Sequence, residues 1–102
     1  MRKKTDSFRD FVLEQLGNGV EARPMFGGHG LYHDDAFFGI LDKGRFYLRT
    51  MPKTRPEFES RGMKPFRPSA RQTLKSYYEV PAEVLEDRDL CRTWASRAWD
   101  RV

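Results

Sequence analysis

The stretch from residue 25 to residue 50 constrains the fold more than any other part of this sequence. It contains three short apolar runs, which cover residues 25–32, 36–41 and 45–49 and are separated by polar turns at 34–35 and 42–44. Apolar runs of this length between turn-forming residues are typical of strands joined by hairpins. We therefore predict strands over residues 29–33, 36–41 and 45–50 in an antiparallel meander.

The rest of the chain predicts helices before, between and after the strands. Apolar side chains at helical spacing in residues 5–16 (Phe8, Phe11, Val12 and Leu16) predict an amphipathic helix with one apolar stripe. Residues 21–26 and 72–80 predict strands, and residues 64–70 predict an irregular segment or an edge strand. A helix is predicted over 54–61, ending at Gly62. A helical region opens at Pro81, and Asp87 is expected to cap its second segment.

This order of elements defines the predicted fold class. It is an α+β domain in two layers, with a largely antiparallel meander sheet and helices before, within and after it, in the order α-β(3-4)-α-β(1-2)-α. Strand alternation places Tyr47 on the face opposite Phe46 and Leu48, and it places Leu74 on the same face as Tyr78.

Length and composition indicate a single domain over residues 1–102. The chain is 38% hydrophobic and 33% charged, and its 14% aromatic residues can supply most of a core. A secretory signal and a run of membrane-spanning length are both missing from the sequence, so we expect a cytoplasmic protein with no membrane partner. Cys91 is the only cysteine, and we expect it to be a small buried side chain in a helix.

The positive charge is concentrated in the middle of the chain. The formal net charge is +4, but residues 53–75 alone contain seven basic and two acidic side chains. A local basic surface attracts polyanions. The basic segment, residues 61–75, is therefore compatible either with a solvated surface or with direct contact to nucleic acid.

The sequence motifs that would indicate catalysis, nucleotide binding or metal binding are weak in this chain. Gly27, Gly28 and Gly30 precede a predicted strand rather than a helix, so they fit neither a Walker loop nor a dinucleotide fingerprint. We expect these glycines to allow a bulge or a positive φ and to be covered by an aromatic ring. His29 and His33 are four residues apart on a strand, about 13 Å, which is too far for them to share a metal ion. Only a sharp bulge at Gly30 would bring them together, with Asp34 or Asp35 as extra ligands. We predict no cofactor and no catalytic residue.

Several blocks of the sequence together resemble one protein family. The blocks are RPMFGGHGLY at 23–32, RFYLR at 45–49 and SYYEVPAEVLED at 76–87, followed by Trp94-Ala95. They are similar to the N-terminal domain of the TfoX/Sxy competence regulators, with a structural motif made of Met25, Phe26, Gly27, Gly28, Gly30, Tyr78 and Pro81. The resemblance covers nearly the whole chain.

The resemblance implies an α+β domain of a bacterial cytoplasmic protein that has no enzymatic activity. Full-length members of this family are positive regulators of natural competence genes and work with the cyclic-AMP receptor protein. They carry a second, helical domain, so the resemblance implies a stand-alone N-terminal domain here.

These observations favour a regulatory module that acts through protein contacts, with the transcription machinery as the expected partner. Direct nucleic-acid binding through the basic segment is the alternative, and a metal or small-molecule site at the Gly27–His33 turn is a third hypothesis. The expected interaction surface comprises Arg61, Lys64, Arg67, Arg71 and Lys75, with Tyr47 and Arg49 beside it. The edge strands of a small sheet and a tryptophan-bearing C-terminal helix are also compatible with a homodimer.

Overall fold

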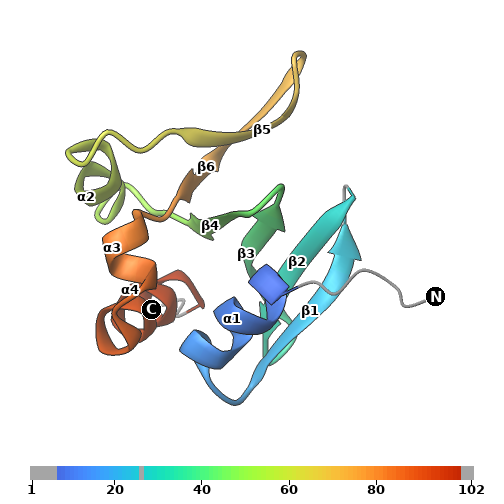
Figure 1. Ribbon diagram of the computed structural model, residues 1–102. Coiled ribbons are helices and arrows are strands. Elements are labelled where there is room, and N and C mark those ends of the chain that lie inside the picture. The colour runs from blue at the N-terminus through green and yellow to red at the C-terminus, as the bar shows by residue number, and fades with distance from the viewer. Residues whose placement is uncertain (1–6, 26, 100–102) are drawn as a thin grey trace.

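The computed structural model describes residues 7–25 and 27–99, which form one open antiparallel sheet and the helices packed on it (Figure 1). The described elements are α1 (Ser7–Leu16), β1 (Val20–Met25), β2 (Gly28–His33), β3 (Ala36–Asp42), β4 (Arg45–Arg49), α2 (Arg55–Glu59), β5 (Pro65–Ser69), β6 (Gln72–Glu79), α3 (Ala82–Leu85) and α4 (Arg88–Trp99). The strand order is β1-β2-β3-β4-β6-β5. The predicted α+β class is confirmed. Phe26 and the expected helix start at residue 5 lie outside the described residues.

Two of the hairpins close through tight two-residue turns. Asp34 and Asp35, between β2 and β3, have φ values of 50° and 65°. Lys43 and Gly44, between β3 and β4, have φ values of 50° and 74°. Two successive residues with positive φ form the turn whose twist matches that of antiparallel strands. The predicted turns therefore set the register of the central sheet.

The ends of the helices follow from local chemistry. Gly17 adopts a φ of 88° and its N–H donates to the Leu13 carbonyl, which ends α1. Asp87 accepts a hydrogen bond from the Leu90 N–H at 3.1 Å and so caps α4, as predicted. Among the helices in the described ranges, none has the length and apolar character needed to cross a membrane.

The main core lies between one face of the sheet and helices α1, α2, α3 and α4. Its fully buried side chains include Val12 from α1, Phe38 from β3, Phe58 from α2 and Val84 from α3. Trp94 of α4 packs edge-on against Phe58, with ring centroids 4.8 Å apart. Phe11 differs from its prediction, because its side chain remains 38% exposed instead of completing the buried stripe of α1.

The other face of the sheet has a smaller core of its own. Ile40, Tyr47 and Phe66 are buried there, and Met25, Phe37, Leu74 and Tyr77 pack around them. Each member of this cluster comes from a strand. A bulge lets β3 supply both cores: Leu31 pairs with Gly39 while Tyr32 pairs with Phe37, which leaves Phe38 as the extra residue. Phe38 then points to the main core.

The β5–β6 hairpin forms one end of the sheet and extends away from α3 and α4 (Figure 1). Its ladder is irregular, since Pro65 pairs with Tyr78 but Phe66 pairs with Leu74. This irregularity interrupts the alternation, so the prediction that Leu74 shares a face with Tyr78 is wrong. Leu74 instead packs in the smaller core. Both edge strands of the sheet contain proline: Pro24 lies in β1, and β5 contains two.

Candidate interaction surfaces

The structure distributes the basic segment between the end of α2 and the β5–β6 hairpin. Lys64, Arg67, Arg71 and Lys75 all have exposed side chains. The Arg67 guanidinium donates to the Ala70 carbonyl at 2.8 Å, which ties the hairpin turn together. These four cations therefore lie on one projecting element.

Arg61 is placed differently from the other four predicted cations. Its guanidinium pairs with Glu83 at 3.1 Å and lies 5.3 Å from the centre of the Trp94 ring. These contacts join the end of α2 to α3 and α4. The side chain is thus engaged in holding the helices together, and little of its charge is left to attract a partner.

Tyr47 is buried and does not contribute to an exposed surface. It is 9% exposed and its ring lies 4.7 Å from that of Phe66. Burial raises the pKa of its phenol, with a further contribution from Glu79. The alternation that placed Tyr47 opposite Phe46 is confirmed, but that face carries the smaller core, which the sequence pattern did not reveal.

Arg49 is half-buried on the same face of the sheet. In the register of β4 and β6 it stands directly opposite Tyr77. Its Nε is buried and has no hydrogen-bond partner among the described residues, and no carboxylate within those residues pairs with its guanidinium. A buried donor without a partner is unusual in folded proteins.

Arg55 is a further cation that the predicted surface omitted. Its Nε donates to the Thr50 hydroxyl at 3.0 Å. That hydroxyl donates to the Ser76 carbonyl at 2.8 Å, and the Thr50 N–H donates to the same carbonyl. Arg55 therefore lies on the face of the sheet that the helices cover, because α2 contributes Phe58 to the main core. Arg49 lies on the opposite face, which carries the smaller core.

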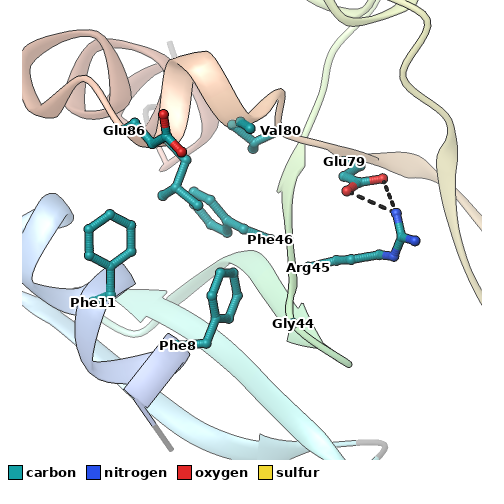
Figure 2. Close-up of a pocket in the computed structure, with 10 residues that line it drawn as sticks. Phe8, Phe11, Gly44, Arg45, Phe46, Glu79, Val80 and Glu86 are labelled. Atoms are coloured by element: carbon teal, nitrogen blue, oxygen red, sulfur yellow. Dashed lines mark hydrogen bonds and ion pairs between the residues drawn. The ribbon is translucent and has the colours of Figure 1, made fainter.

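A second surface is the apolar groove, a pocket of about 290 Å³ between α1, β4 and α3 (Figure 2). Its apolar lining comes from Phe8, Phe11, Phe46, Val80 and Leu85. Figure 2 shows the Phe8 and Phe11 rings on the α1 side of the pocket and Glu86 across from them.

Carboxylates lie along the rim of the apolar groove. Arg45 and Glu79 form a two-pronged ion pair at 3.0 and 3.1 Å, so these two charges neutralise each other. Glu86 is exposed and has no ion pair within the described residues. An adjoining hollow of about 230 Å³ shares Phe8 and Gly44 with the groove and adds Asp42 and Lys43, whose formal charges cancel. The groove thus combines an apolar floor with one carboxylate at its rim, Glu86, that has no ion pair within the described residues.

The Gly27–His33 turn is well packed. Gly27 has a φ of 81°, and a side chain at Gly30 would meet the rings of Phe37 and Tyr32, which cover the backbone there as predicted. His33 stacks on Trp99 with ring centroids 4.0 Å apart. Within the described residues no three His, Cys, Asp or Glu side chains are grouped to hold a metal ion.

Cys91 is fully buried in α4, as its position in the sequence predicted. Burial raises the pKa of its thiol to about 11, from an ordinary value of 9.0. The folded state therefore favours the protonated thiol. Its contribution to stability is complete below about pH 9 and is lost as the pH rises through about 11.

Cys91 is expected to resist thiol reagents in the folded protein. At pH 8 the raised pKa lowers its thiolate fraction by about 100-fold relative to an ordinary thiol, and burial further limits access. Absorbance with a chromogenic disulfide should show one thiol that reacts within minutes in denaturant and over hours without it. Equal rates in the two conditions would contradict this assignment.

The fold defines the class of the protein: a small α+β domain with an open, six-stranded antiparallel sheet and helices packed on one face. The model of the TfoX N-terminal domain family matches residues 12–102, and the chain belongs to this family. It is 34% identical over 85 residues to DNA transformation protein TfoX1 of Aliivibrio fischeri, an alignment that covers 81% of this chain. It is 29% identical over 85 residues, 79% of this chain, to DNA transformation protein TfoX of Haemophilus influenzae. The alignments span 39% of each relative.

Proposed function

We propose that this chain is a non-enzymatic regulatory module in the cytoplasm, and that it promotes expression of DNA transformation genes through contacts with a protein partner. Membership of the TfoX N-terminal domain family supports this role, and the two relatives are named as DNA transformation proteins. The alignments cover 39% of each relative. We therefore assign the role of the full-length relatives to this chain only as part of this proposal.

The observation that carries the protein-contact mechanism is the apolar groove beside Phe11. Large apolar side chains on a protein surface are a common sign of an interaction site when they line a concavity. A volume of about 290 Å³ is at the lower end of the range for small-molecule sites, about 300–1,000 Å³. The groove is therefore better suited to one or two side chains of a protein segment than to a whole cofactor.

Charge complementarity indicates the chemistry of that segment. Glu86 at the rim favours a basic group next to the apolar side chain that enters the groove. The partner is thus a protein that presents a large apolar residue beside a lysine or arginine, for example on one face of a helix.

A complementation experiment in the native host tests this function. A deletion strain would receive the wild-type gene, Phe11→Ser, or the matched control Glu14→Ser, which changes an exposed residue of the same helix away from the groove. Transcript levels of the DNA-uptake genes should recover with the wild type and with Glu14→Ser, but by less than a third with Phe11→Ser. Phe11 is 38% exposed, so loss of the buried part of its ring should cost about 1–2 kcal/mol, and circular dichroism checks that the variant is folded.

Two results would overturn the proposal. One is unchanged transcript levels in the deletion strain, which would remove the regulatory role. The other is full complementation by a folded Phe11→Ser protein, which would remove the groove as the contact site. A photocrosslinker placed at position 11 identifies the partner, and the crosslinked peptide should contain the predicted apolar and basic residues.

A further inference from the structure

The β5–β6 hairpin is a basic two-stranded ribbon whose single acidic residue, Glu79, lies at the end of β6. Between Glu59 and Glu79 the sequence has five cations and no carboxylate. The side chains of Arg67, Arg71 and Lys75 are exposed, as are those of three polar residues that can donate hydrogen bonds, Ser69, Gln72 and Thr73. The ribbon therefore presents positive charge and hydrogen-bond donors to solvent along its length.

The acidic residues at the base of the hairpin offset only part of this charge. Glu59 accepts a hydrogen bond from the Tyr78 hydroxyl at 2.8 Å, and Glu79 is paired with Arg45. Glu57 forms an ion pair with Arg97 at 2.7 Å. Glu57 and Glu79 are thus paired with arginines outside the ribbon, whereas Glu59 keeps its negative charge next to Tyr78. Lys64, Arg67, Arg71 and Lys75 outnumber this carboxylate, so the ribbon carries a net positive charge.

The body of the domain adds one cation at the base of the ribbon. On β4, Arg49 stands beside Tyr77 with a guanidinium that has no acidic partner among the described residues. A bound anion would give this half-buried guanidinium the partner that the described protein groups do not provide.

We propose that the β5–β6 hairpin binds double-stranded DNA, with the ribbon in the major groove and Arg49 on the phosphate backbone. The major groove, about 12 Å wide, admits a two-stranded β-ribbon. Arg71 lies in the turn that joins β5 to β6, and Lys75 lies within β6. Both side chains are exposed, so the ribbon has one cation at its tip and one along its side that can contact separate phosphates at the edges of the groove.

The same features argue against an acidic protein as the partner of the ribbon. Protein interfaces are centred on buried apolar or aromatic anchors, whereas the ribbon beyond Phe66 and Leu74 exposes mainly charged and polar side chains. Pro65 and Pro68 also remove backbone donors from β5, which disfavours the addition of a partner strand. Phosphates need only cations and donors. This binding mode is independent of the apolar groove and goes beyond the proposed function.

Fluorescence anisotropy with a labelled 20-base-pair duplex of mixed sequence tests the proposal, with salt varied from 50 to 200 mM. We expect micromolar affinity at 50 mM salt and a linear fall of log K with log salt. The double variant Arg71→Gln/Lys75→Gln should reduce the slope by about two, since each lost phosphate contact reduces it by about one. The control Lys43→Gln/Arg88→Gln removes two exposed cations elsewhere, and its slope should equal that of the wild type.

The control pair separates binding at the ribbon from general attraction by net charge. Equal losses in the two double variants would overturn the proposal, as would no binding at tens of micromolar in 50 mM salt. Polyglutamate serves as a competitor at matched charge. If it displaced the duplex as effectively as unlabelled DNA does, the ribbon would be a site for acidic polypeptides, and the proposal would fail. Circular dichroism of each variant confirms that it is folded.

Discussion

Replacing Trp94 by alanine is expected to lower the free energy of unfolding by about 3–5 kcal/mol, the usual cost of deleting a large buried aromatic ring. Trp94 is 3% exposed and sits between α2 and α4, with Phe58 at 4.8 Å. The guanidinium groups of Arg61 and Arg97 lie 5.3 and 5.4 Å from its ring. Removing the ring therefore empties the site where α2, α4 and two cations meet. Because small domains have a total stability of about 5–15 kcal/mol, the variant should be close to unfolding.

Urea denaturation gives the measurement, and Trp99 remains as a fluorescent probe in the variant. Trp94→Phe keeps an aromatic ring in the site and should lose less than half as much stability as Trp94→Ala. A loss below about 1 kcal/mol for the alanine variant would mean that the ring does not fill the core as described.

The second large effect is expected for Gly28→Ala. A side-chain carbon at Gly28 would overlap the backbone carbonyl oxygen of Leu41 on the neighbouring strand. Backbone cannot move aside as a flexible side chain can, so the sheet must shift, at a cost of about 1–3 kcal/mol or more. Thermal and urea denaturation should both show the loss.

Gly27 provides the matched control for the Gly28 variant. A side chain there would meet nothing within 4 Å, but φ is 81°, a conformation that asparagine adopts more readily than most residues. Gly27→Asn should therefore cost less than about 1 kcal/mol, whereas Gly28→Asn should be at least as harmful as Gly28→Ala. If the two asparagine variants were equally stable, close packing would not be the reason for glycine at position 28.

Local signals in the sequence were sufficient to predict most of the fold. Turn residues such as Asp34 and Gly44 marked the hairpins, and Asp87 marked the start of α4, because these features depend on a few neighbouring residues. The bulge at Phe38 was beyond such reasoning. It depends on how β3 packs against both β2 and the helices. The bulge reverses which face of the sheet the following side chains point to, and the sequence does not show this because the run is apolar on both faces.

The candidate surfaces were predicted less completely than the fold. The charge pattern located the basic hairpin, but the position of Arg55 beside Ser76 depends on contacts between residues far apart in sequence. The apolar groove was missed because Phe11 falls on the helical stripe with Val12 and was expected to be buried. Spacing along a helix shows which side chains share a face, but not how far the opposing layer extends.

The prolines of the two edge strands have a consequence for how copies of this domain meet. Pro24 in β1 and Pro65 and Pro68 in β5 lack the N–H groups that a further strand would need. Neither edge can therefore template the continuous backbone ladder of a fibril. If two copies associate, they must do so through side-chain surfaces, so that concentrated samples should give discrete, reversible assemblies in place of growing aggregates.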